Sequence, residues 1–145
     1  MKRYCVGFAF KADIPGYVYL IKKKRPEWQK GKLNGVGGKI EENETPLEAM
    51  VREFEEETGI KTTEEQWRYF CYLTEQGEDW EVFFFTTNLK KGAHLRRMNL
   101  EDECVYLIDW REYFFHNPEG LISNLQWLLP LSRENLAKHV VVIER

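Results

Sequence analysis

Residues 45–58 constrain the fold of this chain most, because they carry the sequence marks of an amphipathic helix at both ends and along one side. Thr45 is a suitable N-cap, Pro46 suits the first helical position, and Glu48 completes a Thr-x-x-Glu capping box. Gly59 stands where the helix should end. At about 100° per residue, one side of the segment is apolar and consists of Leu47, Met50, Val51 and Phe54. The sequence therefore predicts a helix that packs this side against a core.

A second side of the predicted helix is acidic. Residues 41–57 contain eight Glu residues, and Glu53, Glu56 and Glu57 share one side of the helix because they are three and four residues apart. Carboxylates this close repel one another, and a bound divalent cation would remove the repulsion. Their hard oxygen ligands suit Mg²⁺ or Mn²⁺. A solvated acidic surface is the alternative that the helix alone leaves open.

Strand patterns surround this helix. Apolar and β-branched residues predict strands over residues 4–10, 17–21, 67–73, 80–87, 104–108 and 140–143. A turn at residues 13–16 makes a hairpin of the first two strands, and residues 74–79 make a second hairpin. Residues 34–40 are a glycine-dense connection, and a second helix within residues 118–138 is interrupted or ended by Pro130. This order of strands and helices indicates a mixed sheet in an α/β or α+β sandwich.

Length and composition limit the class of protein. A chain of 145 residues predicts one domain over residues 1–145, and a net charge of −3 does not suggest a nucleic-acid-binding surface. Cys5, Cys71 and Cys104 are odd in number and lack a CxxC spacing, so we expect reduced thiols and no zinc site. The sequence shows no signal peptide and no run of about 20 apolar residues. We therefore expect a cytoplasmic protein without a membrane partner, and its oligomeric state stays open.

A longer motif favours the metal-binding interpretation of the acidic helix. From Gly38, five residues lead to Glu44 and seven more lead to Arg52-Glu53-Phe54-Glu55-Glu56-Glu57-Thr58-Gly59-Ile60. Over residues 38–60 this spacing resembles the Nudix box, Gly-x5-Glu-x7-Arg-Glu-U-x-Glu-Glu-x-Gly-U with U a bulky apolar residue, at every defining position. The resemblance implies the Nudix fold, an α/β/α sandwich of the α+β class in which helices flank a mixed β-sheet. It also implies a hydrolase that acts on a nucleoside diphosphate linked to a further group.

The resemblance also implies roles for residues in and near the box. Nudix enzymes bind metal along the Arg-Glu-x-x-Glu-Glu segment, and water attacks a phosphorus of the diphosphate. By motif position the Mg²⁺ ligands would be Glu53, Glu56 and Glu57, with the Gly37 carbonyl oxygen as a further ligand. Glu53 is alternatively the general base, and Arg52 would orient it, so the expected catalytic residues are Arg52, Glu53 and Glu56. The metal ions would neutralise the diphosphate and activate the water.

A later carboxylate is expected to join this site. Nudix enzymes often add a metal ligand from a loop just before a strand. Glu103, which precedes the predicted strand at residues 104–108, is the candidate, and Glu101 is the second choice. An ordinary surface acid in a polar loop is the alternative.

The region before the box resembles one subgroup of the family. Leu33-Asn34-Gly35-Val36-Gly37-Gly38-Lys39 is similar to the Trp-Asn-Gly-Phe-Gly-Gly-Lys stretch of mammalian oxidised-purine nucleoside triphosphatases, and a basic run lies upstream at nearly the same distance. The resemblance implies that Asn34 contacts a purine and that Lys23 and Lys39 contact phosphates. Phe70 and Tyr72, as alternate residues of a strand, would stack on the base together. A turn role for the asparagine, solvated lysines and core packing of the rings are the alternatives.

Two departures limit the substrate prediction. Leu33 replaces the aromatic residue before the asparagine, and Ser123 and Asn124 occupy the region where the subgroup has paired acids that contact the purine edge. The predicted reaction is Mg²⁺-dependent hydrolysis of a nucleoside triphosphate, 8-oxo-dGTP or another purine dNTP, to a monophosphate and pyrophosphate, as in nucleotide-pool sanitation. The alternatives are hydrolysis of another nucleoside diphosphate derivative, such as a nucleotide sugar or ADP-ribose, and a nucleotide-binding Nudix module without turnover.

Overall fold

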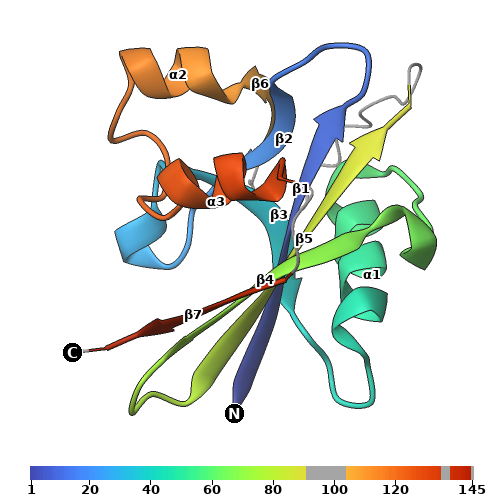
Figure 1. Ribbon diagram of the computed structural model, residues 1–145, viewed down its shortest axis with the longest axis vertical. Helices are drawn as coiled ribbons and strands as arrows, with labels where there is room; N and C mark the ends of the chain where they lie inside the picture. The colour runs from blue at the N-terminus through green and yellow to red at the C-terminus, as the bar shows by residue number, and fades with distance from the viewer. Residues whose placement is uncertain (91–103, 135–137, 145) are drawn as a thin grey trace.

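The computed structural model describes residues 1–90, 104–134 and 138–144, which form a mixed β-sheet with helices on both faces (Figure 1). The strands are β1 (Lys2–Lys11), β2 (Tyr17–Lys22), β3 (Leu33–Lys39), β4 (Arg68–Glu75), β5 (Trp80–Leu89), β6 (Cys104–Asp109) and β7 (His139–Ile143). The helices are α1 (Pro46–Thr58), α2 (Trp110–His116) and α3 (Leu125–Ser132), with short 3-10 helices η1 (Glu27–Gln29) and η2 (Glu64–Gln66). None of the helices in the described ranges has the length and apolar character to cross a bilayer.

The strand order is β6-β2-β3-β1-β5-β4-β7. β1 pairs with β3 in the antiparallel sense and with β5 in the parallel sense, so Val6 has Gly37 as its partner on one side and Phe84 on the other. β7 pairs in parallel with β4 at the edge of the sheet. The start of the Nudix-like motif, which is in β3, therefore lies in the middle of the sheet, beside β1.

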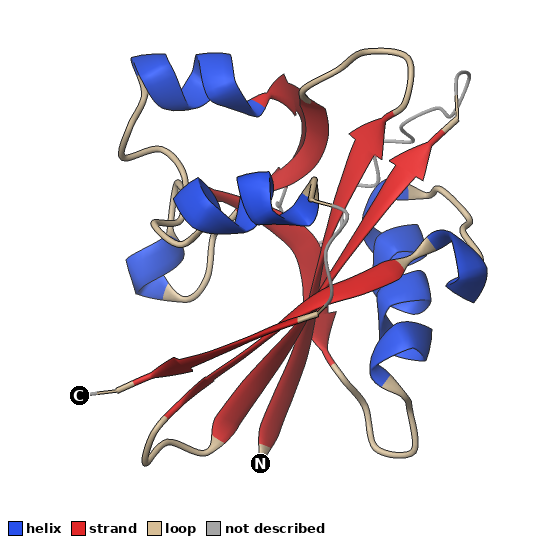
Figure 2. Cartoon of the chain, viewed as in Figure 1, coloured by secondary structure: helices blue, strands red, loops and turns tan. Residues whose placement is uncertain are grey.

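Helices lie on both faces of the sheet (Figure 2), and each face has its own apolar core. Phe8 and Phe10 of β1 point to the face covered by α2 and α3, whereas Ala9 between them points to the face covered by α1. This alternation is what a strand buried on both sides requires. α1 is anchored by Phe54, whose ring meets the ring of Trp67 edge-on with 5.2 Å between centroids. The expected α/β/α sandwich with a mixed sheet is confirmed.

The predicted helix ends are confirmed as well. The Thr45 hydroxyl oxygen accepts a hydrogen bond from the backbone N–H of Glu48 at 3.1 Å, and the Glu48 carboxylate accepts one from the backbone N–H of Thr45 at 2.9 Å. At the other end, Gly59 has φ = 75°, a left-handed conformation that favours glycine. These caps fix where α1 begins relative to the loop that follows β3.

Some elements differ from the prediction. The glycine-dense connection is strand β3, because its backbone pairs with both β1 and β2. Since β3 lies between them over most of their length, β1 and β2 pair directly only at Phe10 and Val18. α2 was not predicted, and it begins where the side chain of Asp109 accepts from the backbone N–H of Glu112. Pro130 lies inside α3 and does not end it.

Phe70 and Tyr72 point to opposite faces of the sheet, because a β-bulge interrupts β4 beside Phe70. Phe70 packs against Phe8 in the core under α2 and α3. The Tyr72 ring packs against Phe83 on the other face, and its hydroxyl donates to Glu81 at 2.7 Å. The expectation that the two rings share a face is therefore wrong, because the extra residue of the bulge inverts the alternation.

Candidate active site

The motif residues form a unit that begins at the end of β3 and continues through α1. Gly37 and Gly38 of β3 pair with Val6 and Cys5 of β1, and a side chain at either glycine would collide with its surroundings. A Cβ on Gly37 would meet the Cys5 carbonyl group, and a Cβ on Gly38 would lie 2.5 Å from Oε1 of Glu53. Gly38 therefore lets the Glu53 carboxylate lie directly against the end of β3, whereas Gly37 lets β3 approach β1 closely.

Arg52 holds this unit together. Its Nε and Nη2 donate to the two carboxylate oxygens of Glu44 at 2.6 and 2.9 Å, the paired geometry that a guanidinium favours. Its Nη1 donates to Glu53 at 2.9 Å and to Glu56 at 3.3 Å. Nη2 also donates to the Lys39 carbonyl oxygen at 3.1 Å. One side chain therefore links the end of β3, the loop and α1.

The same contacts set the ionisation of the glutamates. Hydrogen bonding to Arg52 lowers the pKa of Glu44. Burial raises the pKa of Glu53 because its charged carboxylate loses water, and the contact with Arg52 offsets only part of this effect. A second cation next to Glu53 would favour its charged form. The buried carboxylate therefore favours the binding of a cation beside it.

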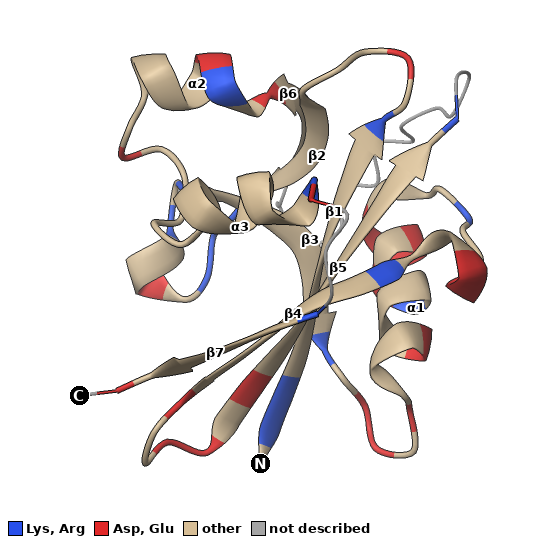
Figure 3. Cartoon of the chain, in the orientation of Figure 1, with Lys and Arg blue, Asp and Glu red and all other residues tan. Residues whose placement is uncertain are grey.

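Acidic residues lie along α1 and in the loop before it (Figure 3). Among the described residues, no three carboxylate, His or Cys side chains lie close enough together to enclose a metal ion by themselves. Glu53 and Glu56 nevertheless converge on one nitrogen of Arg52, and Glu53 rests in the cradle that a Cβ on Gly38 would fill. Hard oxygen donors suit Mg²⁺ or Mn²⁺. The residues present therefore fit a divalent cation, with the largely buried Glu53 among its carboxylates.

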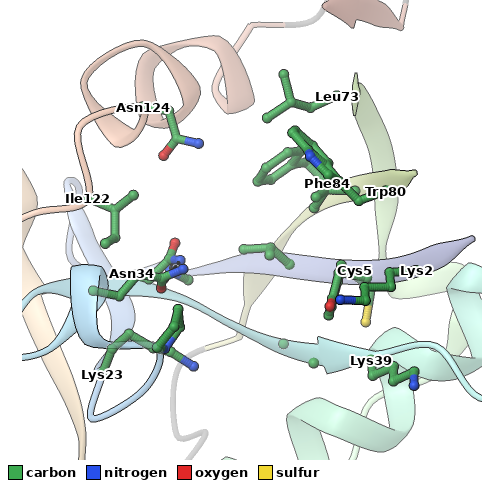
Figure 4. Close-up of a pocket in the computed structure, with 18 of the residues that line it drawn as sticks. Lys2, Cys5, Lys23, Asn34, Lys39, Leu73, Trp80, Phe84, Ile122 and Asn124 are labelled. Atoms are coloured by element: carbon green, nitrogen blue, oxygen red, sulfur yellow. Dashed lines mark hydrogen bonds between the residues drawn. The ribbon is translucent and has the colours of Figure 1, made fainter. Parts of the chain in front are cut away.

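A cavity of about 770 Å³ opens beside this unit, on the face of the sheet covered by α3 (Figure 4). Gly38 and Lys39 line the part nearest the motif, and Leu73, Trp80 and Phe84 line the wall formed by β4 and β5. Pockets for small organic ligands have volumes of about 300–1,000 Å³. The motif thus stands at one side of a cavity that has room for a nucleotide.

Two asparagine side chains lie at the end of the cavity away from Lys39 (Figure 4). The side-chain oxygen of Asn34 accepts from the backbone N–H of Gly35 at 2.8 Å, and its amide nitrogen donates to Gln29 at 3.3 Å. Oδ1 of Asn124, just before α3, is buried and has no hydrogen-bond partner among the described residues. Such an acceptor costs about 1–3 kcal/mol. A ligand N–H would remove this cost, so Asn124 is a stronger candidate for ligand recognition than Asn34.

Some of the other residues that were predicted to bind the substrate line the cavity, and others do not. Lys23, from the segment after β2, and Lys39 both line the cavity. Neither Phe70 nor Tyr72 lines it within the described part of the chain, and β4 contributes Leu73 instead. Glu101 and Glu103, the predicted later carboxylates, lie outside the described residues.

Several residues that line the cavity were not predicted from the sequence, including Trp28, Glu75, Trp80 and Ile122. Glu75 was expected in a hairpin turn, but β4 extends through it. Alternate residues of a strand share a face, so the correct end of β4 would have placed Glu75 beside Leu73. Trp28 and Ile122 come from segments distant in the sequence, and no local pattern brings them together.

The family model described as the NUDIX domain matches residues 8–135 of this sequence. The chain belongs to the Nudix family. An 8-oxo-dGTP diphosphatase of Buchnera aphidicola (subsp. Schizaphis graminum) is a distant relative, 24% identical over 113 residues that cover 77% of this chain and 85% of the relative. The motif from Gly38 to Ile60 lies within the matched residues, at the junction of β3 and α1.

Solved structures of other Nudix proteins have the same fold. A MutT protein from Bacillus halodurans matches with a TM-score of 0.72 at 17% identity, over 98% of this chain and 90% of that chain. A NUDIX hydrolase from Nitrosomonas europaea matches with a TM-score of 0.69 at 18% identity, over 99% of this chain and 79% of that chain. Because these identities are low, the substrate has to be argued from the cavity of this chain.

Proposed function

We propose that this Nudix protein hydrolyses a nucleoside triphosphate to a monophosphate and pyrophosphate with the help of Mg²⁺. The cavity is the observation that carries the proposal, because it joins the Nudix box to a chamber with the dimensions and chemistry of a base pocket. Its box side offers the backbone of Gly37 and Gly38 and the ammonium group of Lys39. Its other walls offer the amides of Asn34 and Asn124 and several aromatic rings. These groups complement a phosphate chain at one end and a purine at the other.

The box residues supply the groups that hydrolysis needs. Glu53, Glu56 and Glu57 would hold the cation, together with the Gly37 carbonyl oxygen. When bound, the cation neutralises the diphosphate and activates the attacking water. Arg52 positions Glu53 and Glu56 through its hydrogen bonds. The alternative role for Glu53 is that of the general base, which accepts the proton of that water in place of binding the cation.

The buried side-chain oxygen of Asn124 favours a substrate whose base is a purine oxidised at C8. Its buried Oδ1 accepts hydrogen bonds, and it has no donor among the described residues. An 8-oxopurine carries an N–H at N7, whereas an ordinary purine has an acceptor at that position. Oδ1 of Asn124 can therefore accept a hydrogen bond from N7–H of the oxidised base, but not from N7 of an ordinary purine. The named activity of the Buchnera relative agrees with such a substrate.

The test is to change Glu56 and Glu57 to Gln separately and to measure pyrophosphate release with Mg²⁺. A metal ligand contributes several kcal/mol to the transition state, so we expect turnover to fall at least about a hundredfold. Nucleotide binding, followed by tryptophan fluorescence, should be largely kept. Glu55→Gln on the same helix is the matched control, because Glu55 is not bonded to Arg52, and it should retain most of the activity.

Three results would contradict the proposal. Full turnover in both variants would remove the box carboxylates from the reaction. Nucleotide binding without any turnover in the parent protein would instead support a non-catalytic Nudix module. Turnover restricted to ADP-ribose or a nucleotide sugar would keep the box chemistry but reject the triphosphate.

A further inference from the structure

The cavity has a buried carboxylate far from the Nudix box. Glu75, the last residue of β4, lines the cavity and is only 7% exposed. It lies two residues after Leu73, which also lines the cavity, so the two side chains share that face of the sheet. Its backbone is fixed on the outer side by β7, where Ile143 is its partner in the parallel pair. Glu75 is therefore a charged group placed by regular structure in an otherwise largely apolar wall.

The sheet order sets how far this carboxylate lies from the reacting phosphates. β4 is three strand positions from β3, which carries the start of the box. Adjacent strands are about 4.8 Å apart, so the two walls are separated by roughly 14 Å. A carboxylate at that distance cannot take part in the attack on the phosphate chain. A phosphate bound at the box instead directs the base of the nucleotide toward the wall of β4 and β5.

The neighbours of Glu75 suit a flat aromatic ligand. Trp80 and Phe84 of β5 line the same wall and offer faces on which a base can stack. A carboxylate has two oxygens and about four acceptor positions, so it can accept two parallel N–H donors in the plane of a base. A ring N–H beside an exocyclic amino group presents this pair of donors, and guanine and its oxidised form both carry it. Adenine and hypoxanthine do not, because each lacks one of the two donors.

We propose that Glu75 is a specificity-determining residue, which selects bases that present a ring N–H beside an exocyclic amino group. The inference rests on the proposed function for the direction in which the nucleotide enters the cavity. In this arrangement Glu75 accepts from the ring N–H and the exocyclic amino group of the base, and Asn124 contacts the N7 side of the base.

The experiment compares the binding of dGMP and dIMP by calorimetry without metal, because dIMP lacks only the exocyclic amino group. We expect the parent protein to bind dGMP at least about tenfold more tightly, as for one hydrogen bond to a charged group. Glu75→Gln should reduce this ratio to about threefold or less, since its amide N–H faces a donor. Glu75→Asp, which keeps the charge but shortens the side chain, should give an intermediate ratio and is the second variant if the Gln protein does not fold.

Glu81→Gln is the matched control. Glu81 is a partly buried carboxylate on the neighbouring strand β5, but it is bonded to Arg3 and Tyr72 on the opposite face of the sheet. This variant should keep the dGMP preference of the parent protein. An unchanged ratio in both Glu75 variants, or no preference in the parent protein, would overturn the inference.

Turnover separates this failure from failure of the proposed function. Hydrolysis of triphosphates with Mg²⁺ but no dependence of base preference on Glu75 overturns the inference alone. A Glu75-dependent preference for dGMP without hydrolysis of any triphosphate overturns the proposed function and leaves the base site in place.

Discussion

At the scale of single residues, the Arg52 network gives two glutamates opposite dependences on pH. Glu44 accepts two hydrogen bonds from Arg52, and its pKa is lowered. Glu53 accepts one from Arg52 but is buried against Gly38, and its pKa is raised. The two carboxylates belong to one network, yet one stabilises the folded protein when ionised and the other destabilises it. This contrast can be measured in the free energy of unfolding.

Glu44→Gln should destabilise the protein by about 2 kcal/mol at pH 7, the value of hydrogen bonds to a charged partner. Because the folded pKa lies below the unfolded value of about 4.3, the stability from Glu44 is present above that value. It is lost as the pH falls through the lower folded pKa. Urea unfolding from pH 7 to pH 3 should therefore show the variant and the parent protein converging in acid. Glu41→Gln in the exposed loop is the control, and an equal loss at every pH would contradict the role of the charge.

Glu53→Gln should raise the stability of the metal-free protein at pH 7. The folded pKa of Glu53 is raised, so its favourable contribution is present below the unfolded pKa and is lost as the pH rises through the folded one. Each kcal/mol regained adds about 2–4 °C to the Tm of a protein of this size. Mg²⁺ at about a hundred times its Kd should stabilise the parent protein by about 2.7 kcal/mol. It should stabilise the variant much less, and equal Mg²⁺ stabilisation of both proteins would remove Glu53 from the metal site.

At the scale of elements, the junction of β3 and α1 depends on two adjacent glycines for different reasons. A Cβ on Gly38 would meet the far end of the flexible Glu53 side chain, whereas a Cβ on Gly37 would meet the backbone carbonyl of Cys5. A carboxylate can move aside, but the pairing of β1 with β3 cannot shift without cost. Gly37 is therefore required for the pairing of β1 with β3, and Gly38 is required for the position of the Glu53 carboxylate.

Substitution of the two glycines by alanine should separate these roles. Gly37→Ala should cost about 1–3 kcal/mol or more in stability, as overpacking does. Gly38→Ala should change stability by less than about 1 kcal/mol, but Mg²⁺ affinity should fall at least about tenfold because Glu53 is displaced. Thermal unfolding and Mg²⁺ titration of both variants check this pattern. Normal Mg²⁺ affinity in a folded Gly38→Ala protein would show that the Glu53 carboxylate need not lie against Gly38 to bind the cation.

The elements that local patterns specify were predicted well. The capping box and Gly59 located α1 to the residue, since caps are local hydrogen bonds. β3 was not predicted, because it depends on partners distant in the sequence: a glycine-rich segment becomes a strand only between β1 and β2. α2 was also missed, although its cap at Asp109 is a local hydrogen bond. The bulge beside Phe70 likewise leaves no mark in the sequence pattern. Its extra residue places Tyr72 on the face of the sheet opposite to Phe70, where the prediction had both rings on one face.

At the scale of the whole molecule, the cavity is the feature that the sequence could not show. The box residues were located by their spacing along one short segment, and the structure keeps them together through Arg52. The base end of the cavity instead combines β4, β5 and the segment before α3, which meet only through the order of strands in the sheet. For this reason Asn124 was noted only by its region, and Glu75 was missed.

The most direct test of this account is turnover with Mg²⁺ across the ordinary NTPs and dNTPs, 8-oxo-dGTP, ADP-ribose and a dinucleoside polyphosphate, with the products resolved. We predict that one guanine-type triphosphate yields a monophosphate and pyrophosphate far faster than the other compounds are hydrolysed. Activity confined to ADP-ribose or the dinucleotide, or release of single phosphates in place of pyrophosphate, would contradict it.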